Sequence, residues 1–260
     1  MDSAKSELAM PAVGEVFDAY ASLRGLAKGQ TKVAPSHDAG LGGWLLSVFD
    51  LDAAGIAALV AGAVAGSAVL AVDGQRERGK QLLRYGICDF VVNDLDEALR
   101  ILKNEVRRKQ PVSVCLSADS EASAREMVER GLQPEVMAGR NVLTAGPLRD
   151  RGAARLEAGT APGELVTWKL RNEAAAWAAG PVLARVDELA AGALGEDVEE
   201  TLWRRRWLQR APRYMGRRLG AERCVRMRDA EATRMMAALH KDAALAAQVI
   251  VVRDGTPVEL

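Results

Sequence analysis

The chain has 260 residues, of which 49% are hydrophobic, and its 35 basic and 35 acidic residues give a formal net charge of zero. This composition is that of a globular protein with a sizeable buried core. It gives no indication of a polyanionic partner for the whole chain, although the charge can still be distributed unevenly along it.

Groups that bind metals or form disulfides are few. The three cysteines, Cys88, Cys115 and Cys224, are widely spaced, and the chain has only two histidines. Neither zinc sites nor disulfide frameworks have this spacing, so we expect no metal, reduced thiols and a cytoplasmic protein. The first residues also lack the basic and apolar regions of a signal peptide.

The first predicted element is an amphipathic helix over residues 12–29, where apolar residues recur at three- and four-residue spacing. A glycine-rich stretch, "AGLGGWLL", follows at residues 39–46. Residues 53–72 carry no charge, but most of them are Ala or Gly, which are weakly hydrophobic. Because this segment also ends in a strand-like pattern, we expect no membrane span and no membrane partner.

A regular alternation of strands and helices begins at Ala68. Four strands are expected at residues 68–72, 88–92, 112–116 and 134–137, with a helix in each interval between them. Gly86 ends the first of these helices, and Asn93 or Asp94 caps the second. The alternation predicts an α/β fold, a Rossmann-like parallel sheet with flanking helices.

The composition changes after Arg140, where a stretch rich in Gly, Pro, Ala and Arg predicts a long connection. A strand is expected at residues 165–170, and helices dominate residues 172–191 and 196–247. The end of the chain predicts a β-hairpin that turns at Asp254–Gly255. We therefore expect a helical N-terminal segment, a Rossmann-like domain, a linker, and a mainly helical Arg-rich part with a terminal hairpin, at residues 1–38, 39–140, 141–164 and 165–260.

Charge is segregated in this last part. Residues 187–200 carry six acids and no base, whereas residues 203–228 carry ten arginines and one acid. One interpretation is that the two runs neutralise each other within the subdomain or across a dimer. The other is an anion-binding patch, with Trp203, Trp207 and Tyr214 as stacking groups; nucleic acid is not expected, because no helix-turn-helix or RNA-binding signature is present. The patch would consist of Arg204, Arg205, Arg206, Arg210, Arg213, Arg217 and Arg218.

Small and polar residues follow each strand of the predicted parallel sheet. Ligands of such sheets bind outside the carboxyl ends of the strands. The sequence places Asp73, Asn93, Ser117 and Asp119 after the first three strands, and Ala138-Gly139-Arg140 after the fourth. Asp73 is the most specific of them, because a carboxylate at the end of the second strand of a nucleotide-binding fold can hold a ribose diol.

The glycine stretch has two interpretations. As a dinucleotide turn, Gly40 and Gly42 supply the first two positions of the fingerprint, but the third falls on Leu45 and no good strand precedes the stretch. Alternatively, the glycines form a loop that lets a helix pack closely. On the first interpretation the candidate cofactor-binding residues are Gly40, Gly42, Gly43, Asp73, Asn93, Ser117 and Asp119; no catalytic residue can be assigned.

The order "AGLGG", "AVLAVD", "NDLDEAL", "PVSVCL" and "VERGLQPEVM" over residues 39–137 resembles the cofactor-binding middle region of urocanase. The resemblance implies a homodimeric, NAD-dependent hydratase of histidine degradation. The sequence departs from that family at its functional segments. Trp44-Leu45-Leu46 stands where urocanases continue with glycines, and "MAGRNVLTAGP" replaces their "TDQTSAHDP" segment.

Three functions follow from this pattern. The first is a diverged relative that is not itself a hydratase and has a regulatory or scaffolding role, in which the "AGLGG" turn is kept while NAD binding is weakened or lost. The second is a urocanate hydratase with bound NAD. The third is an interaction protein that binds an anionic partner through its Arg-rich helices.

Overall fold

The computed structural model describes residues 8–29, 40–140, 146–157, 159–172, 179–195 and 198–260. It divides into two compact units. The first comprises residues 1–12 and 41–157, and the second residues 13–40 and 158–260. The N-terminal helix, which the sequence suggested as a segment of its own, is therefore part of the second unit.

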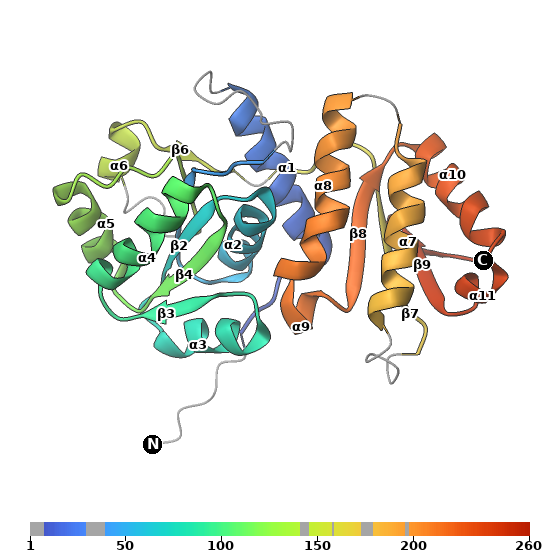
Figure 1. Cartoon of the computed structure of the whole chain (residues 1–260), viewed down its shortest axis with the longest axis horizontal. Coiled ribbons are helices and arrows are strands. Elements are labelled where there is room, and N and C mark those ends of the chain that lie inside the picture. Colours follow the sequence, from blue (N-terminus) through green and yellow to red (C-terminus); the bar gives the residue numbers. More distant parts are fainter. Residues whose placement is uncertain (1–7, 30–39, 141–145, 158, 173–178, 196–197) are drawn as a thin grey trace. The chain divides into compact units, whose positions relative to one another are not determined.

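The first unit contains a six-stranded sheet in the order β3-β4-β2-β1-β5-β6, in which all neighbouring strands are parallel (Figure 1). Its strands are β1 (Leu45–Phe49), β2 (Ala68–Val72), β3 (Phe90–Val92), β4 (Val112–Leu116), β5 (Val136–Ala138) and β6 (Ala154–Arg155). Its helices are α2 (Ala53–Ala65), α3 (Arg76–Tyr85), α4 (Leu95–Arg108), α5 (Ser120–Glu129) and α6 (Gly146–Asp150). The predicted Rossmann-like parallel sheet is confirmed. α6 and β6 lie within the stretch expected to be a linker.

Alternate side chains of each strand point to opposite faces of this sheet, and helices cover both faces. On one face, residues such as Phe49 and Leu70 pack with Leu99 of α4 and Met127 of α5. On the other face α2 lies so close that a Cβ at Gly62 would be 2.7 Å from a methyl of Leu46. The Ala- and Gly-rich segment is thus a buried helix followed by a strand, and no helix among the described residues is long and apolar enough to cross a membrane.

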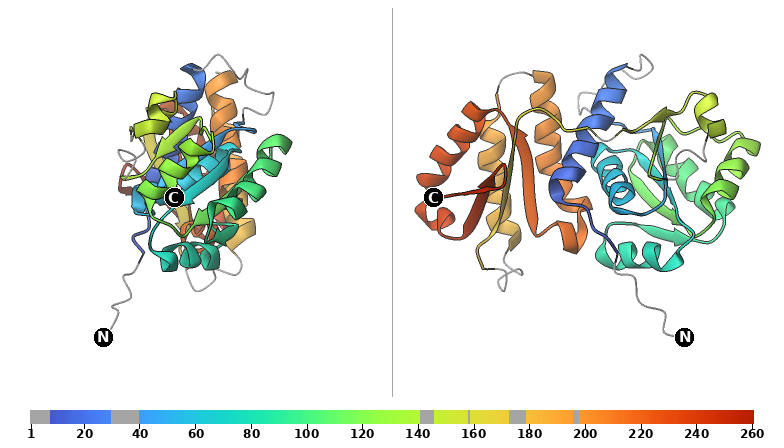
Figure 2. Two further views of the ribbon diagram at one scale, coloured as in Figure 1. Left: turned by 90° about the vertical axis from the view of Figure 1, so that its left-hand side faces the viewer. Right: turned by 180° about the vertical axis from the view of Figure 1, so that it is seen from behind.

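The second unit has a four-stranded antiparallel sheet in the order β10-β9-β7-β8. The right-hand view of Figure 2 shows this unit from behind. Its strands are β7 (Glu164–Leu170), β8 (Glu222–Met227), β9 (Val249–Arg253) and β10 (Thr256–Val258). Its helices are α1 (Val13–Gly29), α7 (Ala179–Ala193), α8 (Val198–Tyr214), α9 (Gly216–Leu219), α10 (Asp229–His240) and α11 (Ala243–Ala246). The hairpin turn is confirmed: Asp254 and Gly255 have φ of +42° and +82°, as its tight turn requires.

Residues 198–247 are mostly helical, as expected, but β8 lies among these helices and was not predicted. Two arginines interrupt the apolar residues of "ERCVRM", so the alternation of a strand is weak in the sequence. The strand forms because it pairs with β7 over six residues, with Val225 opposite Val166. This long-range pairing overrides local preference.

Candidate functional site at the carboxyl edge of the parallel sheet

The strand order fixes where a ligand of the first unit would bind. From β1 the chain builds β2, β3 and β4 on one side, and it then returns to place β5 and β6 on the other. Ligands of open α/β sheets bind at the carboxyl ends of the strands beside such a switch point. The residues that follow β1 and β5 therefore define the candidate site, together with the end of β2.

The glycine stretch does not lie at this edge. Gly40, Gly42 and Gly43 precede β1, so the prediction that they form the turn after the first strand is wrong. The five residues of β1 separate the two edges by about 16 Å. A Cβ at Gly42 would lie 2.9 Å from the carbonyl oxygen of Lys109, just after α4. The geometry matches the alternative interpretation, a loop that packs closely on a helix.

The turn between β1 and α2 is "DLDAAG", residues 50–55. Asp50 has a positive φ of +86°. Asp52 is the N-cap of α2, and its carboxylate accepts a hydrogen bond of 2.9 Å from the backbone N–H of Gly55. A Cβ at Gly55 would lie 2.0 Å from the carbonyl oxygen of Asp50. Glycine is needed here because the first turn of α2 packs directly on the end of β1.

Asp73, predicted as the carboxylate after the second strand, is 5% exposed and already has three partners. It accepts hydrogen bonds from the backbone N–H groups of Leu51 (2.8 Å) and Gln75 (2.6 Å). Arg78 donates to Asp73 at 3.1 Å and to Asp50 at 2.8 Å. Asp73 thus fastens the first turn of the sheet to the second.

Asp50 and Asp73 place two carboxylates around one guanidinium. Burial and the neighbouring Asp73 charge raise the pKa of Asp50, while the Arg78 charge opposes that rise. Arg78 therefore contacts both acids, and its positive charge is balanced within the site.

The switch point is closed by the residues that follow β5. Arg140 donates to the carboxylate of Asp52, with its Nε at 3.1 Å and a terminal nitrogen at 3.0 Å. Gly139 has a φ of +97°, and a Cβ there would be 2.2 Å from the carbonyl oxygen of Phe49. The ends of β1 and β5 are thus in close backbone contact, and an ion pair lies beside them.

A cavity of about 350 Å³ remains at this edge, lined by Asp50, Asp73, Gly74, Gln75, Arg78, Ser120 and Arg140. Asp73 is the one predicted site residue that lines it. Asn93 is exposed, Ser117 donates its N–H to the carbonyl of Val92, and Asp119 caps α5.

The sequence analysis placed Arg140 at this edge but missed Asp50, Asp52 and Arg78. The available signal was an Asp-X-Asp pattern after residues 44–49, which are apolar except for Ser47. That pattern is typical of a strand followed by a helix cap.

The seven arginines predicted as an anion patch do not form one surface. Arg204 and Arg206 are buried, at 5% and 6% exposure, whereas Arg205, Arg213, Arg217 and Arg218 are exposed. Arg210 is half-buried.

Trp203 and Trp207, at 5% and 1% exposure, are core residues and not stacking groups. Trp207 donates its indole N–H to the carbonyl of Cys224 at 2.6 Å. The prediction of a stacking platform is therefore wrong for these two tryptophans.

The acidic and basic runs meet within the second unit. Asp187 of the acidic run lies 3.6 Å from Arg223, and Glu200 lies 3.0 Å from Arg228. These pairs support the interpretation that the runs neutralise each other.

Burial raises the pKa of Asp187 to about 6, against the opposing charge of Arg223 and a hydrogen bond from Trp168.

Residues 39–143 match the protein-family model described as the Urocanase Rossmann-like domain. The match covers the parallel sheet from β1 to β5, and residues 144–260 lie outside it. The middle region of the chain is thus urocanase-like and Rossmann-like, as the sequence resemblance indicated. Among the described residues, no group of three or more His, Cys, Asp or Glu side chains could hold a metal ion.

The residues of the first turn do not fit the pyrophosphate of a dinucleotide. A pyrophosphate needs free N–H groups at the helix N-terminus and glycines that let the backbone approach it. Here the Asp52 carboxylate holds the N–H of Gly55, and no glycine precedes Gly55 in the turn. Asp50 and Asp73 also line the cavity, and their negative charge would repel a phosphate bound there.

Proposed function

We propose that this urocanase-like protein is not a urocanate hydratase and that its Rossmann-like unit has a scaffolding or regulatory role without bound NAD. One observation carries the proposal. The Asp52 carboxylate lies at the N-terminus of α2, where a dinucleotide phosphate would bind, and Arg140 holds it there.

The two arginines that line the cavity at this edge in the described part of the chain are already paired with carboxylates. Arg78 pairs with Asp50 and Asp73, and Arg140 pairs with Asp52. A phosphate would have to displace these internal partners, and each displaced carboxylate would be left without its guanidinium. Breaking the pairs of Arg78 with Asp50 and Asp73, whose side chains are between 6% and 27% exposed, costs more than an exposed contact returns. The pair of Asp52 with the exposed Arg140 contributes less.

Thermal unfolding with NAD+ tests the proposal, because a ligand that binds only the folded state raises its apparent stability. We expect no change in Tm at about 5 mM NAD+, a concentration at which a site with a Kd of about 50 μM would add about 2.7 kcal/mol. Urocanate absorbance should stay constant with the protein and NAD+ together. A rise in Tm, or loss of urocanate, would contradict the proposal.

A variant with a reopened turn provides the positive comparison. Asp50→Gly with Asp52→Ser restores a glycine and an uncharged cap, since Ser is also a good N-cap residue. If the carboxylates are what excludes the phosphate, NAD+ should raise the Tm of this variant more than that of the natural protein. Equal responses would show that the acids are not the obstacle.

We infer from the resemblance that the protein is a cytoplasmic homodimer. Light scattering after size-exclusion chromatography measures the mass directly. A monomer of 27.8 kDa would contradict the inference.

A further inference from the structure

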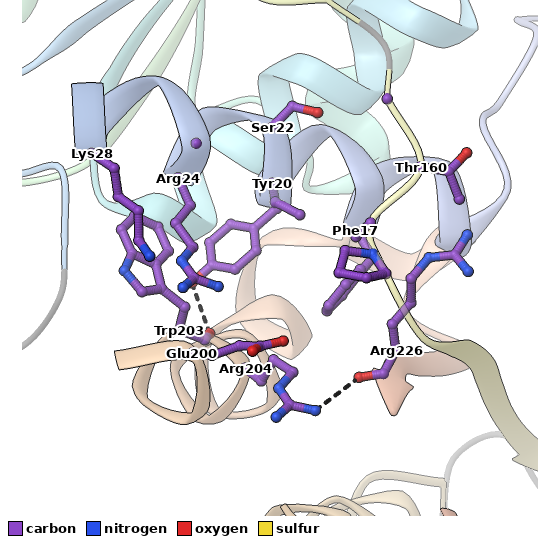
Figure 3. A pocket seen from close by; sticks show the side chains of 15 residues that line it. Phe17, Tyr20, Ser22, Arg24, Lys28, Thr160, Glu200, Trp203, Arg204 and Arg226 are labelled. Atoms are coloured by element: carbon purple, nitrogen blue, oxygen red, sulfur yellow. Dashed lines mark hydrogen bonds between the residues drawn. The ribbon is translucent and has the colours of Figure 1, made fainter. Parts of the chain in front are cut away.

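A second cavity lies in the unit with the antiparallel sheet. Its volume is about 390 Å³, and α1, α8, β8 and residues 159–162 form its walls (Figure 3). This size is within the range of small-molecule sites. The urocanase Rossmann-like match does not reach these elements, so an inference about the cavity does not depend on the function proposed above.

One wall of the cavity is aromatic. Phe17, Tyr20 and Trp203 line it and are 3%, 2% and 5% exposed. The rings of Tyr20 and Trp203 have their centroids 5.4 Å apart, and the Tyr20 hydroxyl donates to the carbonyl of Trp203 at 2.9 Å. Tyr20 also contacts the rings of Phe17 and Trp207, so the small parts of these rings that reach the cavity form a rigid apolar wall.

Two of the cations that line the cavity are neutralised inside the unit. Arg204 makes a bidentate contact with Glu231, at 2.5 and 3.0 Å. Arg226 makes another with Asp18, at 2.7 and 2.9 Å. Neither guanidinium has an unbalanced charge to offer.

The charged groups at the rim are paired as well. Lys28 lies 2.9 Å from Glu199. The one acid that lines the cavity, Glu200, lies 3.0 Å from Arg228.

Arg24 is different. In the described part of the chain no carboxylate pairs with it, whereas Arg204 and Arg226 each have one. Its Nε, like that of Arg204, is buried without a hydrogen-bond partner. Figure 3 shows its guanidinium beside Tyr20, on the aromatic side of the cavity. The terminal nitrogens of this guanidinium are not among the buried atoms without a partner, so an anionic ligand in the cavity could pair with them and balance the charge.

We propose that this cavity binds a small anion with a flat apolar body, such as an aromatic carboxylate. The carboxylate pairs with Arg24, and the apolar body contacts the small parts of Phe17, Tyr20 and Trp203 that line the cavity. Arg24 supplies one positive charge, so the fitting ligand carries one negative charge. The hydroxyls of Ser22 and Thr160 also line the cavity and can donate to the carboxylate.

Isothermal titration of the full-length protein with 2-naphthoate tests the proposal, with 2-naphthamide and inorganic phosphate as comparison ligands. We expect 2-naphthoate to bind, and Arg24→Gln to weaken its binding about tenfold or more, because a charge-assisted hydrogen bond is lost. Arg205→Gln is the matched control, since Arg205 is an exposed arginine of α8 that does not line the cavity. Its affinity for 2-naphthoate should be unchanged.

Each part of the proposal can fail separately. No binding of 2-naphthoate at about 10 mM, where even weak ligands of this size register, would overturn it. Equal affinity in Arg24→Gln and the natural protein would show that Arg24 is not the anion partner. Binding of 2-naphthamide as tight as that of 2-naphthoate would exclude a charge requirement. Phosphate binding as tight as that of 2-naphthoate would exclude the flat body.

Discussion

The two units have cavities of similar size, about 350 and 390 Å³, and arginines line both. In the parallel-sheet unit, Arg78 and Arg140 each contact carboxylates of the same edge. In the antiparallel unit, Arg204 and Arg226 are paired in the same way, but no described carboxylate pairs with Arg24. The fold points to the first cavity as the ligand site, whereas the charge balance points to the second. The presence of arginines alone does not indicate a binding site. An arginine whose charge has no internal carboxylate partner does.

The strongest test of this comparison concerns the buried pair of the second unit. Glu231→Gln should lower the free energy of unfolding by about 3–5 kcal/mol, because it leaves the Arg204 guanidinium buried without its carboxylate. The carboxylate is so strongly held that its pKa falls to about 2: burial alone would raise it, but hydrogen bonds from Arg204 and two backbone N–H groups outweigh burial. Urea unfolding gives the difference.

Glu200→Gln is the matched control for that prediction. It breaks an ion pair with Arg228, whose side chain is 56% exposed, and should cost less than about 1 kcal/mol. Replacing both partners, with Arg204→Met and Glu231→Leu, should recover most of the stability. If Glu231→Gln cost no more than Glu200→Gln, the second unit would not depend on internal neutralisation.

Asp187 gives the next largest effect, as a dependence on pH. Its folded-state pKa of about 6 exceeds the ordinary value of 3.8, so the folded state binds this proton more tightly than the unfolded chain. Its contribution to stability is therefore greatest below about pH 4, falls as the pH rises to about 6 and is constant above that, a change of about 3 kcal/mol. Asp187→Asn cannot ionise, so the difference between natural protein and variant isolates this group. A difference independent of pH would contradict the prediction.

A third test concerns the closure of the first unit between β1 and β5. Gly139→Ala should cost about 2–3 kcal/mol, because it adds a Cβ at a positive φ, against the backbone of Phe49. Gly131→Ala is the control: its φ of +69° is also positive, but nothing lies within 4 Å of the added Cβ. It should cost only the conformational part, about 1 kcal/mol. Equal costs in urea unfolding would mean that the ends of the two strands are not in tight contact.

Most of the first unit could be predicted from the sequence because local signals agree there. An uninterrupted apolar run marks β2, and β4 is apolar except for Ser113. Gly86 ends α3 in a left-handed conformation, and Asp94 caps α4. The second unit was harder. β8 contains arginines and depends on its pairing with β7, a partner more than fifty residues earlier, and such pairing leaves little trace in a local pattern.

The candidate site was predictable in location but not in composition. The carboxyl ends of β2 to β5 lie where the sequence placed them, and Asp73 is at the edge of the cavity. The first turn was misassigned because "AGLGG" drew attention to the wrong end of β1. That Arg140 pairs with Asp52, 88 residues away, and that Arg24 has no described carboxylate partner, are properties of the folded chain that spacing cannot show.

The smallest expected effect concerns the role of Asp52. Asp52→Ala removes the cap of α2 and should cost about 1 kcal/mol, whereas Asp52→Ser retains a capping oxygen and should cost a few tenths. The pair of variants separates the cap from the ion pair with Arg140, because both lose the negative charge and only Asp52→Ala loses the cap. Asp52 has a side chain 20% exposed and Arg140 one 72% exposed, so the ion pair itself should contribute little to stability. If Asp52→Ser were as destabilising as Asp52→Ala, the charge on Asp52 would matter more to the fold than its cap, and the carboxylate at this turn would be a structural requirement and not only an obstacle to phosphate.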